Sequence, residues 1–200
     1  MKKIAITGSI ACGKTTLLNE LTKCGFQVFN CDSTIAELYK RPEVLEKVKE
    51  VFPLCFENCT FDKKKLLSIL IQKPYLFRKL EDILYPYLHT EMMIFEEKSR
   101  RKNKKIIFFE VPLLFEKRME KFYDQIIVVN STKKKRQKNF TERGGDIKVF
   151  QVLNSMQWSD IKKVCIAKKY GFLLFPLTSI KMLPKNITVL LNEIRKCTLI

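Results

Sequence analysis

The chain has 200 residues, of which 46% are hydrophobic, and its formal net charge is +17. This length suits one domain, with room for an inserted subdomain. No apolar run is long enough to cross a bilayer, which excludes a transmembrane protein. Met1-Lys2-Lys3 leads directly into an apolar segment rather than a signal peptide. We therefore expect a cytoplasmic protein with no membrane partner.

The excess of Lys and Arg allows two interpretations. Clustered basic residues neutralise nucleic-acid phosphates, whereas a lysine-rich enzyme can use them on a small polyphosphate substrate. The basic peaks at residues 98–105 and 133–138 have no interleaved aromatic residues, which a stacking surface for nucleic acid would show. The second interpretation is favoured, and nucleic acid is not expected as a partner.

The seven cysteines are odd in number and scattered along the chain. Cys55 and Cys59 are four residues apart, but no second pair and no neighbouring His completes a zinc site. We expect reduced, mostly buried thiols. One of them, Cys12, lies inside the motif described next, so an oxidation-sensitive site is a hypothesis at that position.

The strongest motif comes first along the chain. Residues 3–7 form a short β-branched apolar run that predicts a buried strand, and residues 16–21 have leucines at helical spacing. Between them, residues 8–15 fit G-x-x-x-x-G-K-[ST], the phosphate-binding P-loop. Strand, glycine-rich turn and helix are the context that this motif needs. The residues expected to bind ATP are Gly8, Ser9, Ile10, Ala11, Cys12, Gly13, Lys14, Thr15 and Thr16.

Each part of the loop has a chemical role. Gly8 and Gly13 carry no Cβ, so the backbone can wrap closely around phosphates. The N–H groups of the loop and the helix N-terminus then point at anionic oxygens. Lys14 can reach the β- and γ-phosphates, and the Thr15 hydroxyl can hold Mg²⁺. ATP and Mg²⁺ are therefore the expected cofactors.

Asp32 is the next candidate. Residues 26–29 alternate as a second strand, and Asp32 follows the end of that strand, before a helical stretch at 34–39. In an open α/β sheet, ligands bind at the carboxyl ends of the strands, which is also the edge of the P-loop. Asp32 is therefore a candidate catalytic residue; the alternative is that Asp32 or Ser33 only caps the helix.

Helices without intervening strands follow and break the βα alternation. The pattern predicts helices at 43–52, at 63–71 after a cap at Asp62, and across 74–101 with an interruption or kink at Tyr85-Pro86. Residues 53–60 are expected to be irregular. Together these features indicate a helical insertion at 62–103.

Two more buried strands are predicted at 106–109 and 124–129. Glu110 ends the first of them, where a Walker-B-type acid would hold Mg²⁺ directly or through water. The alternative is that Glu110 only caps a helix at 113–119.

The rest of the chain completes the expected fold. A basic helix ending near residue 142 leads to a glycine turn at 143–146, where small kinases place a mobile lid. A helix at 160–169, a strand at 171–175 and a final helix at 184–196 follow. The sum is an α/β fold, a three-layer αβα P-loop kinase with a mostly parallel five-stranded sheet, a helical insertion and a short lid.

Several of these motifs occur in an order that is similar to dephospho-CoA kinases. They are the P-loop, Asp32, residues 61–66, residues 80–86 and the block Glu110-Val111-Pro112-Leu113-Leu114-Phe115-Glu116. The resemblance to this family covers about residues 1–130. It implies one kinase domain over residues 1–200 that transfers the γ-phosphate of ATP to the ribose 3′-hydroxyl of dephospho-CoA, the last step of coenzyme A synthesis.

The resemblance also implies roles for single residues. Asp32 matches the aspartate thought to accept the proton of the substrate hydroxyl. The lid would span about residues 136–157, with Arg136 and Arg143 closing over the phosphoryl group. The residues that would bind dephospho-CoA are Asp32, Asp62, Lys63, Pro112, Leu113 and Leu114.

The chain departs from the family pattern mainly in the lid. Asn139 and Leu153 stand where the family has arginines, so Arg136 and Arg143 serve in a shifted register or the kinase is weak or altered. Other departures are Asn30 for an aspartate, Tyr85 for a histidine and Lys168 for an aspartate. Two alternatives stay open: another small P-loop nucleoside or nucleotide kinase, and a non-catalytic protein that binds nucleotide or nucleic acid. We expect a monomer.

Overall fold

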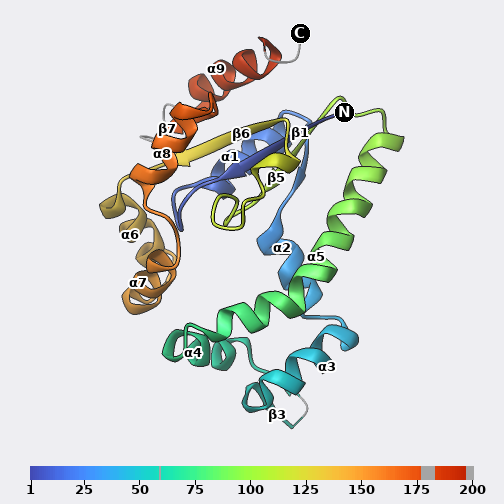
Figure 1. Ribbon diagram of the computed structural model, residues 1–200, viewed down its shortest axis with the longest axis vertical. Helices are drawn as coiled ribbons and strands as arrows, with labels where there is room; N and C mark the ends of the chain where they lie inside the picture. The colour runs from blue at the N-terminus through green and yellow to red at the C-terminus, as the bar shows by residue number, and fades with distance from the viewer. Residues whose placement is uncertain (59, 177–182, 197–200) are drawn as a thin grey trace. The chain divides into compact units, whose positions relative to one another are not determined.

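The computed structural model describes residues 1–58, 60–176 and 183–196. The chain divides into two compact units, and Figure 1 follows it through both. The first unit is made of residues 1–30 and 99–200, and the second unit is the continuous segment 31–98. The helical insertion expected at 62–103 thus falls mostly in the second unit, which begins earlier and takes in residues 31–61 as well.

The first unit contains a five-stranded parallel sheet with the strand order β2-β5-β1-β6-β7 (Figure 1). Its strands are β1 (Lys2–Thr7), β2 (Gln27–Phe29), β5 (Ile106–Glu110), β6 (Gln125–Asn130) and β7 (Leu173–Pro176). Uninterrupted apolar runs form the central strands because helices cover both faces of a parallel sheet. The expected α/β fold with a parallel five-stranded sheet is confirmed.

Helices surround this sheet. They are α1 (Lys14–Lys23), α6 (Lys133–Glu142), α7 (Ile147–Ser155), α8 (Asp160–Lys169) and α9 (Leu183–Lys196), with a 3-10 turn at Glu120–Phe122. One core cluster joins Ile4 and Ile6 of β1 to Leu17 and Leu21 of α1. Phe108, Ile127, Phe175, Leu190 and Ile194 belong to the same cluster. Strand β1 is therefore held by apolar contacts with elements from both ends of the chain.

The second unit is mainly helical. It contains α2 (Cys31–Leu38), α3 (Pro42–Val51), a 3-10 turn at Pro53–Cys55, the hairpin β3 (Phe56–Glu57) and β4 (Thr60–Phe61), α4 (Lys63–Gln72) and most of α5 (Leu76–Arg101). The cap at Asp62 is confirmed, because its Oδ1 accepts hydrogen bonds from the N–H groups of Lys64 at 2.8 Å and Lys65 at 3.0 Å. At Tyr85-Pro86, where an interruption or kink was expected, α5 is not interrupted and runs on through Pro86.

Two local expectations were wrong. Residues 53–60, expected to be irregular, contain one strand and the start of the next in the β3–β4 hairpin. The helix expected at 113–119 does not form; this segment is a series of turns. Arg118 adopts a left-handed backbone with φ of 53°, which a regular helix does not allow, while Leu114 and Phe115 are buried. Glu110 therefore has no helix at 113–119 to cap.

Five cysteines lie in the described part of the chain, and all five are free thiols. Cys12, Cys31 and Cys55 are buried, and Cys24 and Cys165 are exposed. Cys59 and Cys197 lie outside the described residues. In the described part of the chain, no helix has the length and apolar character needed to span a membrane.

Candidate active site

The P-loop follows the central strand of the sheet. At Gly8 a Cβ would lie 2.4 Å from the carbonyl oxygen of Val129 and 2.7 Å from Sγ of Cys12. Only glycine fits there, because the loop passes directly against β6. Gly13, with φ of 103°, occupies the position before α1 and turns the chain into the helix. The close approach of the loop to the sheet fixes its path to the helix N-terminus.

Lys14 is buried in this loop, with only 8% of its surface exposed. Its Nζ donates hydrogen bonds to the carbonyl oxygens of Gly8 at 3.1 Å and Ser9 at 3.3 Å. The next residue, Thr15, is exposed in the first turn of α1. The loop therefore holds a fixed ammonium group within it and presents a hydroxyl to solvent at the helix N-terminus.

Glu110 lies beside the start of the P-loop. In the parallel register of β1 and β5, it pairs with Ile6, and it is 1% exposed. The Thr7 hydroxyl also donates to the carbonyl oxygen of Pro112 at 3.4 Å. Next to Pro112, Leu113 is half-buried and Leu114 is fully buried. Among the predicted residues, Glu110 thus ends β5, which neighbours the P-loop strand, and Pro112, Leu113 and Leu114 follow it.

Hydroxyl and carboxylate oxygens, as on Thr15 and Glu110, are the donors that Mg²⁺ prefers. In the parts of the chain that the structure describes, no group of three or more His, Cys, Asp or Glu could hold a metal. This sparse donor set fits Mg²⁺, which usually keeps several waters and takes further ligands from substrate phosphates.

The P-loop is also bound from outside by α6 and by the segment that begins α8. Arg136 of α6 is 3% exposed, and its Nη1 donates to the carbonyl oxygen of Ile10 at 3.2 Å. Its Nη2 donates to Oδ2 of Asp160 at 2.7 Å, and Oδ1 of the same carboxylate accepts from the Ser9 hydroxyl at 2.6 Å. Three side chains far apart in sequence are thus joined on one loop.

Two amide side chains extend these contacts. Oε1 of Gln157 accepts a hydrogen bond from the N–H of Ile10 at 2.7 Å. Nδ2 of Asn139 donates to the carbonyl oxygen of Ala11 at 3.2 Å. Asn139 stands where the family pattern has an arginine, and here it binds the P-loop backbone. Neither Gln157, at the end of the expected lid segment, nor Asp160 was predicted to bind the loop, and no motif marks Asp160 as its neighbour.

A buried ion pair lies at the same end of α8. Nζ of Lys163 is 3.1 Å from Oε1 of Glu116, and the Lys163 side chain is 1% exposed. The same Glu116 oxygen accepts from the N–H of Trp158 at 2.7 Å. Burial lowers the pKa of Lys163 from its ordinary value, an effect that Glu116 partly offsets and that the nearby charge of Lys14 adds to. The start of α8 is thus tied to the Glu110–Glu116 block and the P-loop.

Cys12 does not have the features of a reactive thiol. It is fully buried, and burial raises its pKa above the ordinary value, although the neighbouring Lys14 acts in the opposite direction. A raised pKa lowers the thiolate fraction at neutral pH, and the thiolate is the form that reacts. The structure therefore favours slow oxidation and alkylation at this position.

The two arginines assigned to the lid have different surroundings. Arg143 is exposed at the end of α6, next to the glycine turn. Arg136 is buried, and its guanidinium also lies 5.7 Å from the ring centre of Phe150 on α7. Of the two, only Arg143 has a solvent-exposed side chain in the described structure.

Asp32 belongs to the second unit. It lies in the first turn of α2, which begins at Cys31 rather than at residue 34, and its side chain is exposed. The sequence places it three residues after the end of β2. Its role towards the acceptor hydroxyl stays a prediction.

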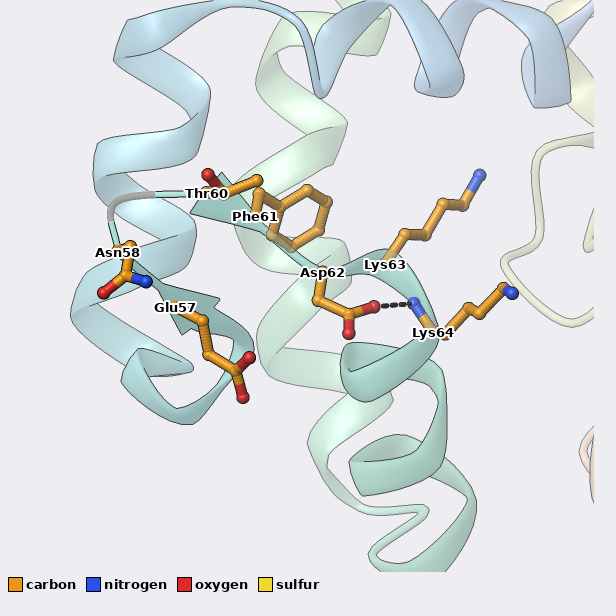
Figure 2. Close-up of a pocket in the computed structure, with 7 residues that line it drawn as sticks. All are labelled: Glu57, Asn58, Thr60, Phe61, Asp62, Lys63 and Lys64. Atoms are coloured by element: carbon orange, nitrogen blue, oxygen red, sulfur yellow. Dashed lines mark hydrogen bonds between the residues drawn. The ribbon is translucent and has the colours of Figure 1, made fainter.

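Asp62 and Lys63 line an open pocket of about 510 Å³ in the second unit. Figure 2 shows its walls: the β3–β4 hairpin on one side and the first residues of α4 on the other, with Lys63 and Lys64 extending from the helix start. Tyr39 stacks on Phe61 beside this pocket, with ring centres 5.1 Å apart, and Nζ of Lys63 lies 5.7 Å from the Tyr39 ring centre. Burial raises the pKa of Tyr39 to about 12, so this phenol stays neutral at physiological pH.

Comparison with known proteins decides the family. The family model for dephospho-CoA kinase (CoaE) matches residues 2–169. The chain belongs to the dephospho-CoA kinase family. The match continues through α8, well past residue 130 or so, where the recognisable motifs of the sequence end.

Individual relatives agree with this assignment. The dephospho-CoA kinase of Bartonella quintana is 36% identical over 164 residues, which cover 82% of this chain and 84% of the relative. That of Rickettsia typhi is 29% identical over 195 residues, covering 97% of this chain and 98% of the relative.

Solved structures agree on the fold. A crystal structure from Thermus thermophilus superposes with a TM-score of 0.78 at 25% identity, over 96% of this chain and 97% of that one. The dephospho-CoA kinase from Campylobacter jejuni has a TM-score of 0.62 at 19% identity, over 96% of this chain and 97% of that one.

Proposed function

We propose that this dephospho-CoA kinase transfers the γ-phosphate of ATP to the ribose 3′-hydroxyl of dephospho-CoA, which completes coenzyme A. The observation that carries the proposal is a P-loop on the central strand of a parallel sheet, in a chain that the family model matches over residues 2–169. The Glu110–Glu116 block, next to that strand, adds the residues that distinguish this family from other P-loop kinases.

The phosphate end of the reaction rests on the first unit. The loop N–H groups and the N-terminus of α1 bind phosphate oxygens, and the Lys14 ammonium lies within the loop to neutralise the β- and γ-phosphates. Thr15 and Glu110 are the residues that would hold Mg²⁺, which when bound would neutralise charge on the transferring phosphoryl group. Arg143, exposed beside the glycine turn, is the candidate for a lid cation.

The acceptor end rests on Asp32 and on the second unit. Asp32 hydrogen-bonds the 3′-hydroxyl and orients it in line with the γ-phosphate. Its proposed contribution is mainly positioning, because holding the hydroxyl in line with the γ-phosphate lowers the barrier to transfer. Asp62 and Lys63 at the open pocket, together with Pro112, Leu113 and Leu114, bind the rest of dephospho-CoA.

The direct test is ATP-dependent phosphorylation of dephospho-CoA by the purified protein. Turnover that disappears in Lys14→Ala supports the proposal. A panel of nucleosides and nucleotides is assayed in parallel, and turnover of one of these without turnover of dephospho-CoA would overturn the substrate assignment.

Asp32→Asn tests the acceptor residue. Because Asp32 acts on the hydroxyl, this change is expected to lower kcat far more than ATP affinity. A kcat that stays within a few-fold of the wild type would show that Asp32 does not have this role.

We also propose that the enzyme works as a cytoplasmic monomer, in line with the expectations from its sequence. Light scattering of the purified chain and cell fractionation test the two parts of this proposal.

A further inference from the structure

Arg136 and Asp160 form a largely buried ion pair that contacts the P-loop from outside it. Arg136 comes from α6, Asp160 from the first turn of α8, and both reach the loop within the first unit. The Arg136 side chain is 3% exposed and that of Asp160 is 21% exposed, so their ion pair at 2.7 Å is largely removed from water. Solvent screens such a pair much less than a surface pair.

The guanidinium of Arg136 is held on several sides. Besides Asp160, it donates to Oδ1 of Asn154 at 2.9 Å and to the carbonyl oxygen of Ile10 at 3.2 Å. The ring of Phe150 lies beneath it at 5.7 Å. Each of these contacts limits its motion, and a guanidinium has a fixed fork of donors, so its orientation is defined. Arg136 is therefore bound to the P-loop rather than extended into solvent.

The Asp160 carboxylate has an electrostatic effect on the loop. It accepts the Ser9 hydroxyl at 2.6 Å, which places a negative charge directly beside a loop that binds polyphosphate anions. That charge alone would repel ATP. Arg136 neutralises it and at the same time holds the next carbonyl oxygen of the loop, that of Ile10.

We propose that Arg136 and Asp160 are positioning residues that fix the P-loop between Ser9 and Ile10 for ATP. Asp160 orients the Ser9 hydroxyl, and Arg136 holds the Ile10 carbonyl and cancels the charge of Asp160. Arg136 acts through the loop, while lid closure is left to Arg143. This inference rests on the proposed ATP-dependent activity but concerns ATP binding, which can be measured without an acceptor.

The test is a double-mutant cycle with Arg136→Gln, Asp160→Asn and the double variant, read out as the Kd for ATP by calorimetry and as kcat and KM. Arg136→Gln leaves the carboxylate uncompensated, so the Kd for ATP should rise at least about tenfold, equivalent to about 1.4 kcal/mol. Asp160→Asn retains an acceptor for Ser9 but removes the charge that holds the Arg136 guanidinium in place, and this weaker anchoring should raise the Kd for ATP only about threefold. The double variant should bind ATP more tightly than Arg136→Gln, because the uncompensated charge is gone. The KM for dephospho-CoA should stay within about twofold throughout.

The exposed pair of Lys23 and Glu20 on α1 is the matched control, since its atoms are 2.6 Å apart and the Lys23 side chain is 72% exposed. The corresponding variants Lys23→Gln and Glu20→Gln should leave the Kd for ATP unchanged. Arg136→Lys, which keeps the charge, should recover part of the affinity lost in Arg136→Gln.

Three results would overturn the proposal. One is a lower Tm in Arg136→Gln with an unchanged Kd for ATP, which would make the pair merely structural. Another is strict additivity of the two changes. The third is an unchanged Kd for ATP in Asp160→Asn. If Arg136→Gln does not fold, this third result is sufficient to overturn the proposal. If the wild type binds ATP but does not turn over dephospho-CoA, the substrate assignment fails and the ATP-binding test still stands.

Discussion

The P-loop region of the first unit and the Asp62 pocket of the second unit differ in how strongly their polar side chains are buried and bound within the protein. Around the P-loop, Lys14, Arg136 and Glu110 are almost fully buried, and the first two bind the backbone of the loop. Around the pocket, Asp62 and Lys63 lie on an open surface. The proposed phosphate end is therefore preorganised, as electrostatic stabilisation of phosphoryl transfer requires, whereas the proposed acceptor end relies on exposed groups.

The largest expected effect, and the strongest test of this contrast, is the loss of Lys14. Lys14→Ala removes the only side-chain ammonium that hydrogen-bonds the loop carbonyls among the described residues, and kcat/KM should fall by at least about 100-fold. Steady-state assays with ATP and dephospho-CoA measure this loss.

Lys63→Ala is the comparison from the open pocket. It should raise the KM for dephospho-CoA up to about tenfold and leave the KM for ATP unchanged. An equal rise of the KM for ATP in both variants would contradict the difference proposed between the P-loop region and the open pocket.

The second prediction concerns stability at the phosphate end. Lys163→Met leaves Glu116 buried without its cation, and the free energy of unfolding should fall by about 3–5 kcal/mol in urea titrations. Combining it with Glu116→Gln, which still accepts the Trp158 N–H, should restore part of that loss. A Lys163→Met variant as stable as the wild type would mean that the pair does not hold α8 in place.

The lowered pKa of Lys163 also predicts that the free energy of unfolding depends on pH. Burial lowers its pKa in the folded protein, so between that pKa and the ordinary lysine value the unfolded chain binds more protons. The free energy of unfolding contributed by this group therefore rises as the pH increases through that range. The free energy of unfolding of the wild type, measured at several alkaline pH values, should increasingly exceed that of Lys163→Met as the pH rises. If the difference in free energy of unfolding became smaller as the pH rises, the pKa of Lys163 would not be lowered in the folded protein.

A smaller effect is expected at the helix cap of the open pocket. Asp62→Ala removes the acceptor of two N–H groups at the start of α4 and should lower the free energy of unfolding by about 1 kcal/mol. It should also raise the KM for dephospho-CoA. Thr132→Ala on α6 is the matched cap in the first unit, where the hydroxyl accepts from Lys135 N–H at 3.3 Å. Thr132 belongs to the first unit and is not a lining residue of the pocket, so its loss should leave the KM for dephospho-CoA unchanged. An equal rise of that KM in both variants would show that the pocket does not bind the substrate.

The smallest effect is on thiol chemistry. Cys24 and Cys165 are exposed and should react with an alkylating reagent before Cys12, whose pKa is raised by burial. Mass spectrometry after short exposure at neutral pH should find the first two modified and the kinase still active. Early modification of Cys12 with loss of activity would instead support an oxidation-sensitive P-loop.

Local patterns predicted the P-loop, its strand and helix and the cap at Asp62, because each depends on a few adjacent residues. The β3–β4 hairpin was not predicted, since two-residue strands carry too little alternation to be recognised. The turns at 112–118 were not predicted either, and Arg118 among them takes a left-handed backbone that its residue type does not require. The contacts of Ser9 and Ile10 with Gln157 and Asp160 link positions about 150 apart, and only the folded chain brings them together.

The position of β1 has a consequence for how the protein folds during synthesis. The ribosome makes β1 first, yet its neighbours are β5, which begins at Ile106, and β6, which begins at Gln125. The central strand must therefore wait, unpaired, until more than half of the chain has emerged. Residues 31–98 form their own contacts in the meantime and can become compact earlier, because their pairings are closer in sequence. Chaperone binding to nascent chains should accordingly be strongest before β5 and β6 are complete.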